Sequence, residues 1–332
     1  MKSLEQIAYS KDKSFLFYKP EGYFLLSIIG FIRQLLCRKA NAYDMIYWLI
    51  ISIRFVMRRP LSSYHPILYW LRVTQKRLAR RLHWAFSAKY YAKSKSSERL
   101  EYRYNKHTSK LIRKLGESDL RLQYNKVTNL RIAAEAMNGI TIYPGEYFSF
   151  CRLVGKPTAR RGFLEGMELS FGEARSGIGG GICQLSNLIH WMVLHSPLQV
   201  IERANHSFDP FPDEGRVLPF GSGAAIFYNY IDLVFYNPTQ SAFQLVFNIA
   251  EHQLEGELLS CTPREHKYHI YERNHKFTRE NGVIYRHNEI WQKVTTKGQE
   301  PITLQDNCLY RNKVVVKYSL DERHIVVEWQ CW

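Results

Sequence analysis

The sequence predicts an α+β protein in three parts: a basic helical arm over residues 1–116, a mixed α/β globule with a mainly antiparallel sheet over 117–262, and a β-rich extension over 263–332. The charge distribution is one indication that the arm is a separate part, because 24 of the 46 Lys and Arg residues but only 6 of the 30 Asp and Glu residues lie in it. The other is a change near residue 117 from a long helical pattern to helices alternating with short apolar strands. The net charge of +16 is therefore +18 in the arm and −2 in the rest.

Two short, very apolar helices are expected early in the arm, over residues 23–36 and 43–57. They could pack together or lie in a bilayer interface. Neither suits a membrane span, which needs about 20 apolar residues, and the charged N-terminus does not have the pattern of a signal peptide. A third, long helical pattern follows over residues 67–115.

Aromatic and basic residues are interleaved along this third segment, in which 14 Lys and Arg residues accompany only Glu98 and Glu101. An anionic membrane surface suits the pattern, since rings lie at the headgroup level and each cation contributes about 1 kcal/mol. Nucleic acid would accept such a surface but is the less favoured partner, and a solvated helix face is the structural alternative. The arm, residues 1–116, is expected to bind an anionic membrane surface.

Six cysteines are spread over the chain without the C-x-x-C spacing of zinc or redox sites. This usage indicates a reducing compartment, and hence a cytoplasmic protein attached peripherally to the inner face of the membrane. No cofactor and no metal ion is expected.

The globule is expected to contain helices over residues 130–137 and 182–195, with a glycine-rich loop over 176–181 before the second helix. Short strands are expected at 140–143 and 147–150. Four further strands are expected to form one sheet, at 198–201, 225–226, 231–235 and 243–249. Hairpins are expected to fill the last 70 residues.

The clearest candidate for chemistry is Cys183, at the expected start of a helix behind Gly179, Gly180 and Gly181. A helix N-terminus lowers the pKa of a thiol because its dipole and free N–H groups favour the thiolate. The glycines allow backbone N–H groups to approach a substrate, as an oxyanion hole requires. Nucleotide binding is not favoured, because no P-loop lysine follows. The structural alternative is a small buried residue beside a tight turn.

A second candidate segment is Glu202–Ser207, after the strand that follows the Cys183 helix. It supplies His206 as a base, and a later strand supplies Asp232 as the group that orients it, with Asn229 as the second choice. This order of cysteine, histidine and acid is one that a thiol hydrolase or acyltransferase can use. His206 could equally be a hydrogen-bonded turn histidine.

A Cys/His metal site is a further alternative, because His190 lies seven residues beyond Cys183 and so on the same helix face. His206 would complete such a site. No paired-ligand spacing supports it, so it is the less favoured interpretation.

Five separated segments carry a family resemblance. They are Tyr143–Phe150, Gly162–Gly166, Gly179–Asn187, Glu202–Ser207 and Ile231–Asn237. In this order they closely resemble the VanW family, which is found beside glycopeptide-resistance genes, and the similarity covers roughly residues 65–295. The resemblance implies a bacterial protein connected with peptidoglycan metabolism or vancomycin-type resistance.

Individual residues can be assigned through the family's motifs. The matching positions are Gly179, Gly180, Gly181, Cys183, Gln184, Glu202, Arg203, His206 and Ser207. Cys151 stands where many relatives have Asn or another residue, so it is a poor candidate for a general function. The chain resembles the short, single-module members, since neither an N-terminal membrane helix nor a wall-binding module is visible.

Two functions follow from these patterns. One is a thiol-dependent hydrolase or acyltransferase acting on a peptide or amide of a wall precursor, with Cys183, His206 and Asp232 as its catalytic residues. The other is a non-catalytic accessory protein that binds a peptidoglycan precursor or a partner enzyme at the membrane. The expected substrate-binding residues are Gly179, Gly180, Gly181, Gln184, Ser186, Glu202, Arg203 and Ser207.

Overall fold

The computed structural model describes six stretches of the chain, and the two expected apolar helices at 23–36 and 43–57 lie outside them. The described residues are 65–112, 120–170, 173–206, 208–210, 212–213 and 217–326. The chain divides into two units, Met1–Arg72 and Val73–Trp332. The helix α3 (Pro66–Phe86) begins in the first unit and continues into the second. No helix of the described stretches is both long and apolar enough to span a membrane.

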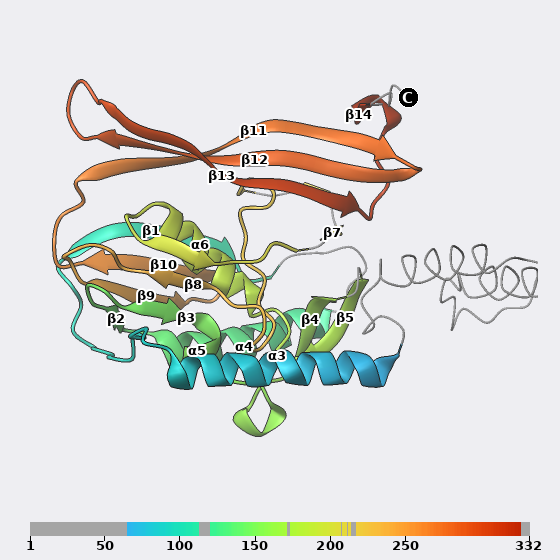
Figure 1. The fold of residues 1–332 in the computed structure, drawn as a ribbon, viewed down its shortest axis with the longest axis horizontal. Coiled ribbons are helices and arrows are strands. Elements are labelled where there is room, and N and C mark those ends of the chain that lie inside the picture. The colour runs from blue at the N-terminus through green and yellow to red at the C-terminus, as the bar shows by residue number, and fades with distance from the viewer. Residues whose placement is uncertain are drawn as a thin grey trace, which may run out of the picture. The chain divides into compact units, whose positions relative to one another are not determined.

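A four-stranded antiparallel sheet lies at the centre of the second unit, in the order β1-β10-β9-β2 (Figure 1). Its strands are β1 (Tyr102–Lys110), β2 (Ile140–Ile142), β9 (Phe243–Ile249) and β10 (Gln253–Ser260). The helical prediction for 67–115 is therefore wrong beyond α3, because β1 pairs with β10 along its length. Cations such as Arg103 and Lys106 occupy exposed positions of this edge strand, where charge discourages further strand pairing.

Two helices pack against this sheet and against each other. The helix α4 (Leu120–Met137) contacts β9, and α6 (Cys183–Leu194) contacts β1 and β10. Gly256 in β10 makes room for α6, since a Cβ there would lie 2.3 Å from the Leu188 side chain. The predicted helix 182–195 is confirmed as α6, and the predicted helix 130–137 is the second half of α4.

Shorter elements surround this core. They are β3 (Tyr147–Ser149), α5 (Phe150–Val154), the 3-10 turn Ala159–Arg161, β4 (Glu165–Ser170), β5 (Glu173–Ile178), β6 (Gln199–Glu202) and β8 (Val234–Tyr236). A small antiparallel sheet has the order β3-β8-β6, and β4 pairs with β5. The start of the predicted loop 176–181 belongs to β5, and the predicted strand 225–226 is wrong because these residues lie in irregular chain.

The C-terminal part is a second, larger sheet (Figure 1). Its strands are β7 (Phe208–Asp209), β11 (His266–Glu280), β12 (Val283–Thr296), β13 (Thr303–Val316) and β14 (Ile325–Val326), and the 3-10 turn Glu322–His324 precedes the last. The three long strands are antiparallel, and β11 joins β12 through Asn281-Gly282, which both have the positive φ of a tight hairpin turn. The predicted α+β fold with a β-rich C-terminal part is confirmed, and the domain boundaries at 116 and 262 stay predictions.

Candidate functional site

The glycine segment Gly179–Gly181 is packed against other parts of the core. A Cβ on Gly180 would lie 2.1 Å from the carbonyl oxygen of Gly166 in β4, and one on Gly181 would lie 2.2 Å from the side chain of Lys126. Gly179 and Gly181 also have φ values of +84° and +90°, which glycine adopts without strain. The glycines therefore allow two backbone segments to touch. They were expected instead to let a substrate approach the backbone.

Asn129 of α4 holds these two backbone segments together. Its Nδ2 donates to the carbonyl oxygens of Leu164 at 3.0 Å and Gly180 at 2.9 Å, and its Oδ1 accepts from the backbone N–H of Leu164 at 2.8 Å. The side chain is fully buried, so losing it would leave these backbone groups unpaired. No local sequence pattern marks Asn129 for this role, because its partners lie 35 and 51 positions away.

Cys183 is the first residue of α6, but its sulfur lies against the hydrophobic core. The thiol donates to the carbonyl oxygen of Ile226 at 3.7 Å, and burial raises its pKa. The expectation of a lowered pKa is wrong, because burial of the thiol raises its pKa by more than the helix N-terminus lowers it. Two backbone hydrogen bonds lower the pKa of Cys183, but burial outweighs them, so the net shift is opposite to that of an activated thiol.

Two neighbouring residues expected to bind substrate have partners within the protein. Gln184 donates from Nε2 to Ser109 Oγ and to the Lys110 carbonyl, both at 2.8 Å, and so ties α6 to β1. Ser186 is buried and donates to the carbonyl oxygen of Ala224 at 2.6 Å. Both side chains stabilise the position of α6.

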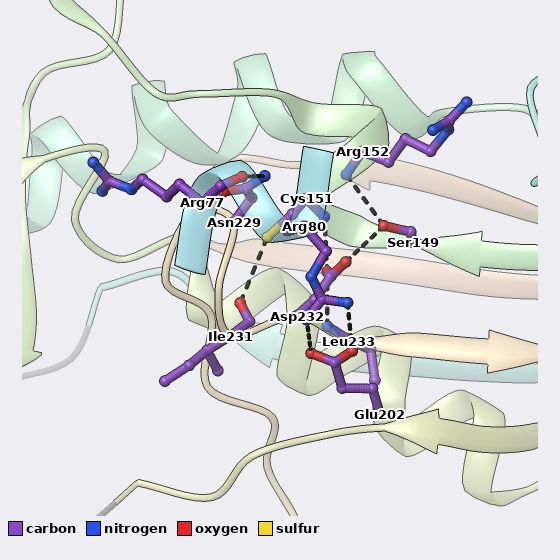
Figure 2. A network of polar contacts seen from close by, with 10 residues as sticks. All are labelled: Arg77, Arg80, Ser149, Cys151, Arg152, Glu202, Asn229, Ile231, Asp232 and Leu233. Atoms are coloured by element: carbon purple, nitrogen blue, oxygen red, sulfur yellow. Dashed lines mark hydrogen bonds and ion pairs between the residues drawn. The ribbon is translucent and has the colours of Figure 1, made fainter. Parts of the chain in front are cut away.

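Asp232 belongs to a buried network with residues of β3 and α5 (Figure 2). Its carboxylate accepts from Ser149 Oγ at 2.6 Å and from the backbone N–H groups of Cys151 and Leu233, both at 2.8 Å. Burial raises the pKa of Asp232. Ser149 is also the N-cap of α5, since its Oγ accepts from the Arg152 N–H at 3.2 Å. The carboxylate therefore anchors the start of α5, and none of its hydrogen bonds goes to His206.

Glu202 and Asn229 hold the part of α3 that lies in the second unit (Figure 2). The Glu202 carboxylate forms a two-point ion pair with the Arg80 guanidinium, with Nη1 and Oε2 2.6 Å apart. Asn229 donates to the Arg77 carbonyl at 3.4 Å, and Arg77 Nε donates to the Tyr228 carbonyl at 2.8 Å. Glu202 thus has a structural partner at the position where substrate binding was expected.

Arg203 points to a different set of groups. Its guanidinium donates to the carbonyl oxygens of Gly221 and, at 2.7 Å, Gly223, and lies 4.1 Å over the ring of Tyr310 in β13. Burial lowers its pKa. These contacts attach the segment 202–206 to the C-terminal sheet. In the same segment His206 is half-buried, with its backbone N–H on Asn205 Oδ1 at 2.9 Å, while the expected site residue Ser207 lies outside the described residues.

His190 is completely buried beside Arg203 and Tyr310. Its Nδ1 donates to the Ser222 carbonyl at 2.7 Å, so its Nε2 is the acceptor for the Tyr310 hydroxyl at 3.0 Å. Burial and the nearby Arg203 cation lower its pKa to about 3, which keeps the ring neutral. Both ring nitrogens are occupied, which leaves neither for the metal role considered from the sequence. The described stretches hold no group of three or more His, Cys, Asp and Glu side chains suited to a metal ion.

A cleft of about 860 Å³ lies between the core and the C-terminal sheet. Its walls are β6 with the turn before it, the loops near residues 240 and 263, and parts of β12 and β13. Amide, hydroxyl and aliphatic side chains dominate the lining, and among the described residues Glu265 is the one that lines the cleft with a fixed charge. The size is typical of ligand pockets, which range from about 300 to 1,000 Å³.

Comparisons with known proteins agree with the sequence motifs. The family model described as VanW like protein matches residues 125–259. The vancomycin B-type resistance protein VanW of Enterococcus faecalis (strain V583) is 30% identical over 265 residues, which cover 80% of this chain and 96% of that protein. The chain belongs to the VanW family. The uncharacterized protein YoaR of Bacillus subtilis (strain 168) is 34% identical over 89 residues, 26% of this chain and 29% of that protein. No solved structure matches.

The VanW segment 125–259 runs from α4 to β10. It therefore contains the glycine segment, Cys183, the segment 202–206 and Asp232, together with β6 of the cleft. The long strands β12 and β13 lie beyond it. The cleft is thus bordered by the VanW segment on one side and by the C-terminal sheet on the other.

Proposed function

We propose that this protein is a non-catalytic accessory protein of glycopeptide resistance, which binds a peptidoglycan precursor in the cleft between the core and the C-terminal sheet. One observation carries the proposal: the thiol and the acid expected to act together have separate partners. The Cys183 thiol donates to Ile226, and the Asp232 carboxylate holds Ser149 and Cys151. The connection with vancomycin resistance rests on the name of the Enterococcus faecalis relative.

The chemistry of a thiol nucleophile explains why this geometry favours binding over catalysis. The thiolate is the reactive form, so a catalytic cysteine needs a lowered pKa or an adjacent base. The pKa of Cys183 is raised by burial, and its hydrogen bond is to a backbone carbonyl. An oxyanion hole also needs N–H groups that a substrate can reach, whereas Gly166 and Lys126 occupy the space beside Gly180 and Gly181.

The test is vancomycin susceptibility in the host bacterium after replacement of the gene. Deletion should increase susceptibility, and Cys183→Ser, which keeps a donor for Ile226, should restore resistance to within twofold of the unmodified protein. Cys261→Ser is the matched control, because this cysteine is exposed. Unchanged susceptibility after deletion would contradict the link with resistance. Loss of resistance with a folded Cys183→Ser protein would establish the enzyme instead.

We also propose that α3 holds the protein at an anionic membrane on the cytoplasmic face. Leu78, Leu82 and Phe86 follow one another at intervals of four residues, so they share one face of the helix. Their exposed fractions are 55%, 49% and 83%. Lys76 and Arg81 are also exposed on this helix. Exposed apolar residues beside cations are the pattern of a helix that lies in a membrane interface.

A further inference from the structure

We infer that the cleft takes an uncharged, extended peptide, which adds a strand to the open edge of β6. The inference rests on the proposed function, because it names the part of the precursor that enters the same cleft: an uncharged stretch of its peptide, with the phosphates and free carboxylates of the precursor outside the cleft. Two independent features support it: the way in which β6 borders the cleft, and the chemistry of the lining.

The strand β6 meets the cleft with its edge. Successive side chains of a strand point to opposite faces, so a strand that lines a cleft with one face contributes every second residue. Here all residues from Ser196 to Ile201 line the cleft, including the consecutive Gln199 and Val200 of β6, which precede the irregular pairing at Ile201. In the described sheet β3-β8-β6 this strand is the last, so one edge has no partner strand there.

An open strand edge is a binding surface for the main chain of a peptide. Its N–H and C=O groups pair with those of an added strand, while side-chain pockets supply specificity. The four residues of β6 extend over about 13 Å at about 3.3 Å per residue. The edge therefore has room for a segment of about four extended residues.

The chemistry of the lining indicates an uncharged segment. The chain carries a net charge of +16, but among the described residues no Lys or Arg lines the cleft, and Glu265 is the one fixed charge there. A phosphate or a free carboxylate would lose hydration without gaining a Lys or Arg partner. Exposed carboxamides, Gln199, Gln240 and Gln305, line the cleft instead, and can bond to amide groups, while Ile201 and Leu304 offer apolar contacts.

The experiment measures retention of the full-length protein on a library of end-blocked pentapeptides composed of Ala, Gly, Ser, Gln and Leu. The best peptide is then remade in two versions, or phases: one carries N-methyl groups at its odd-numbered residues and the other at its even-numbered residues. Strand addition predicts that one phase weakens binding about tenfold or more, because it removes main-chain donors facing β6, and that the other phase is tolerated. A free C-terminal carboxylate should not increase affinity.

Variants locate the binding. Gln199→Trp combined with Gln305→Trp fills the cleft from two exposed positions and should abolish retention. Gln299→Trp is the matched control, since this glutamine is exposed and lies outside the cleft. Retention of no peptide, equal effects of the two N-methyl phases, or binding of tri-N-acetylchitotriose in place of peptides would overturn the inference.

The same double variant separates this inference from the proposed function. If it increases vancomycin susceptibility while no peptide binds the unmodified protein, the cleft serves resistance with another ligand, and only the inference fails. If peptides bind with the expected phase dependence and the double variant leaves susceptibility unchanged, the inference holds and the proposed function fails.

Discussion

Acid should destabilise this protein through the buried ring of His190. The folded-state pKa of His190 is about 3, because the ring is buried and lies beside Arg203, whereas an unfolded histidine has a pKa of about 6.5. A pKa lowered by folding contributes stability that is present above pH 6.5 and is lost as the pH falls toward 3. Each pKa unit corresponds to about 1.4 kcal/mol, so from pH 7 to pH 5 the loss is about 2 kcal/mol.

Urea unfolding of the full-length protein, followed by tryptophan fluorescence at pH 7, 6 and 5, measures this loss. The test variant is His190→Asn, whose amide can still donate to the Ser222 carbonyl. At pH 7 it should be less stable by about 1–3 kcal/mol, because the hydroxyl of half-buried Tyr310 loses its acceptor. Between pH 7 and pH 5 it should lose about 2 kcal/mol less than the unmodified protein.

Comparing the two proteins removes the contributions of other titrating groups. Asp232 acts in the opposite direction, because a pKa raised by folding gives stability at low pH that is lost as the pH rises through the raised value. This contribution is common to both proteins. His252→Asn, at an exposed position, is the matched control for the removal of a histidine. Equal pH dependence of the unmodified protein and His190→Asn would refute a buried, neutral His190.

Three further predictions follow from the packing and exposure of single residues. Gly180→Ala should lower the free energy of unfolding by about 2 kcal/mol or more, since its Cβ meets backbone; urea unfolding measures this, and a change within about 0.5 kcal/mol would contradict it. Exposed Cys261 should react with iodoacetamide at least tenfold faster than Cys183, as followed by mass spectrometry, and the reverse order would restore the nucleophile hypothesis. Flotation should place the protein with phosphatidylglycerol vesicles and not with phosphatidylcholine alone. Leu82→Glu should weaken this binding about tenfold while the exposed control Val217→Glu does not, and equal flotation of all three proteins would exclude α3 as the anchor.

The sequence predicted the helices and strands whose residue pattern is local. It missed elements whose secondary structure depends on pairing with a distant segment of the chain. The helix α6 follows from a long apolar run that ends at Ser196-Pro197, and β9 follows from the apolar run at 243–249. The strand β1 was missed because its many cations fit a helical arm equally well. Only pairing with β10, about 150 residues later in the chain, makes it a strand.

The sequence identified the segments of the candidate site. The roles of their residues depend on partners elsewhere in the chain, which the spacing of residues does not reveal. Cys183 and its glycines are adjacent in sequence, and a helix start behind glycines suggests an activated thiol. The deciding groups are Ile226, which accepts from the thiol, and Gly166, which fills the space beside Gly180. A raised pKa results from burial, and burial is a property of the whole core.

The pair Glu202-Arg203 gives the segment a structural meaning that its charges alone would not suggest. Glu202 is the last residue of β6, and Arg203 follows it. Glu202 pairs with Arg80 of α3, while Arg203 donates to the carbonyl groups of Gly221 and Gly223 and lies over the ring of Tyr310. Tyr310 lines the cleft, so one strand end fixes both a wall of the cleft and the helix proposed to meet the membrane. Charge reversal of Glu202 and Arg80 together should therefore preserve the function, whereas Glu202→Lys alone should disturb both peptide retention and vesicle binding.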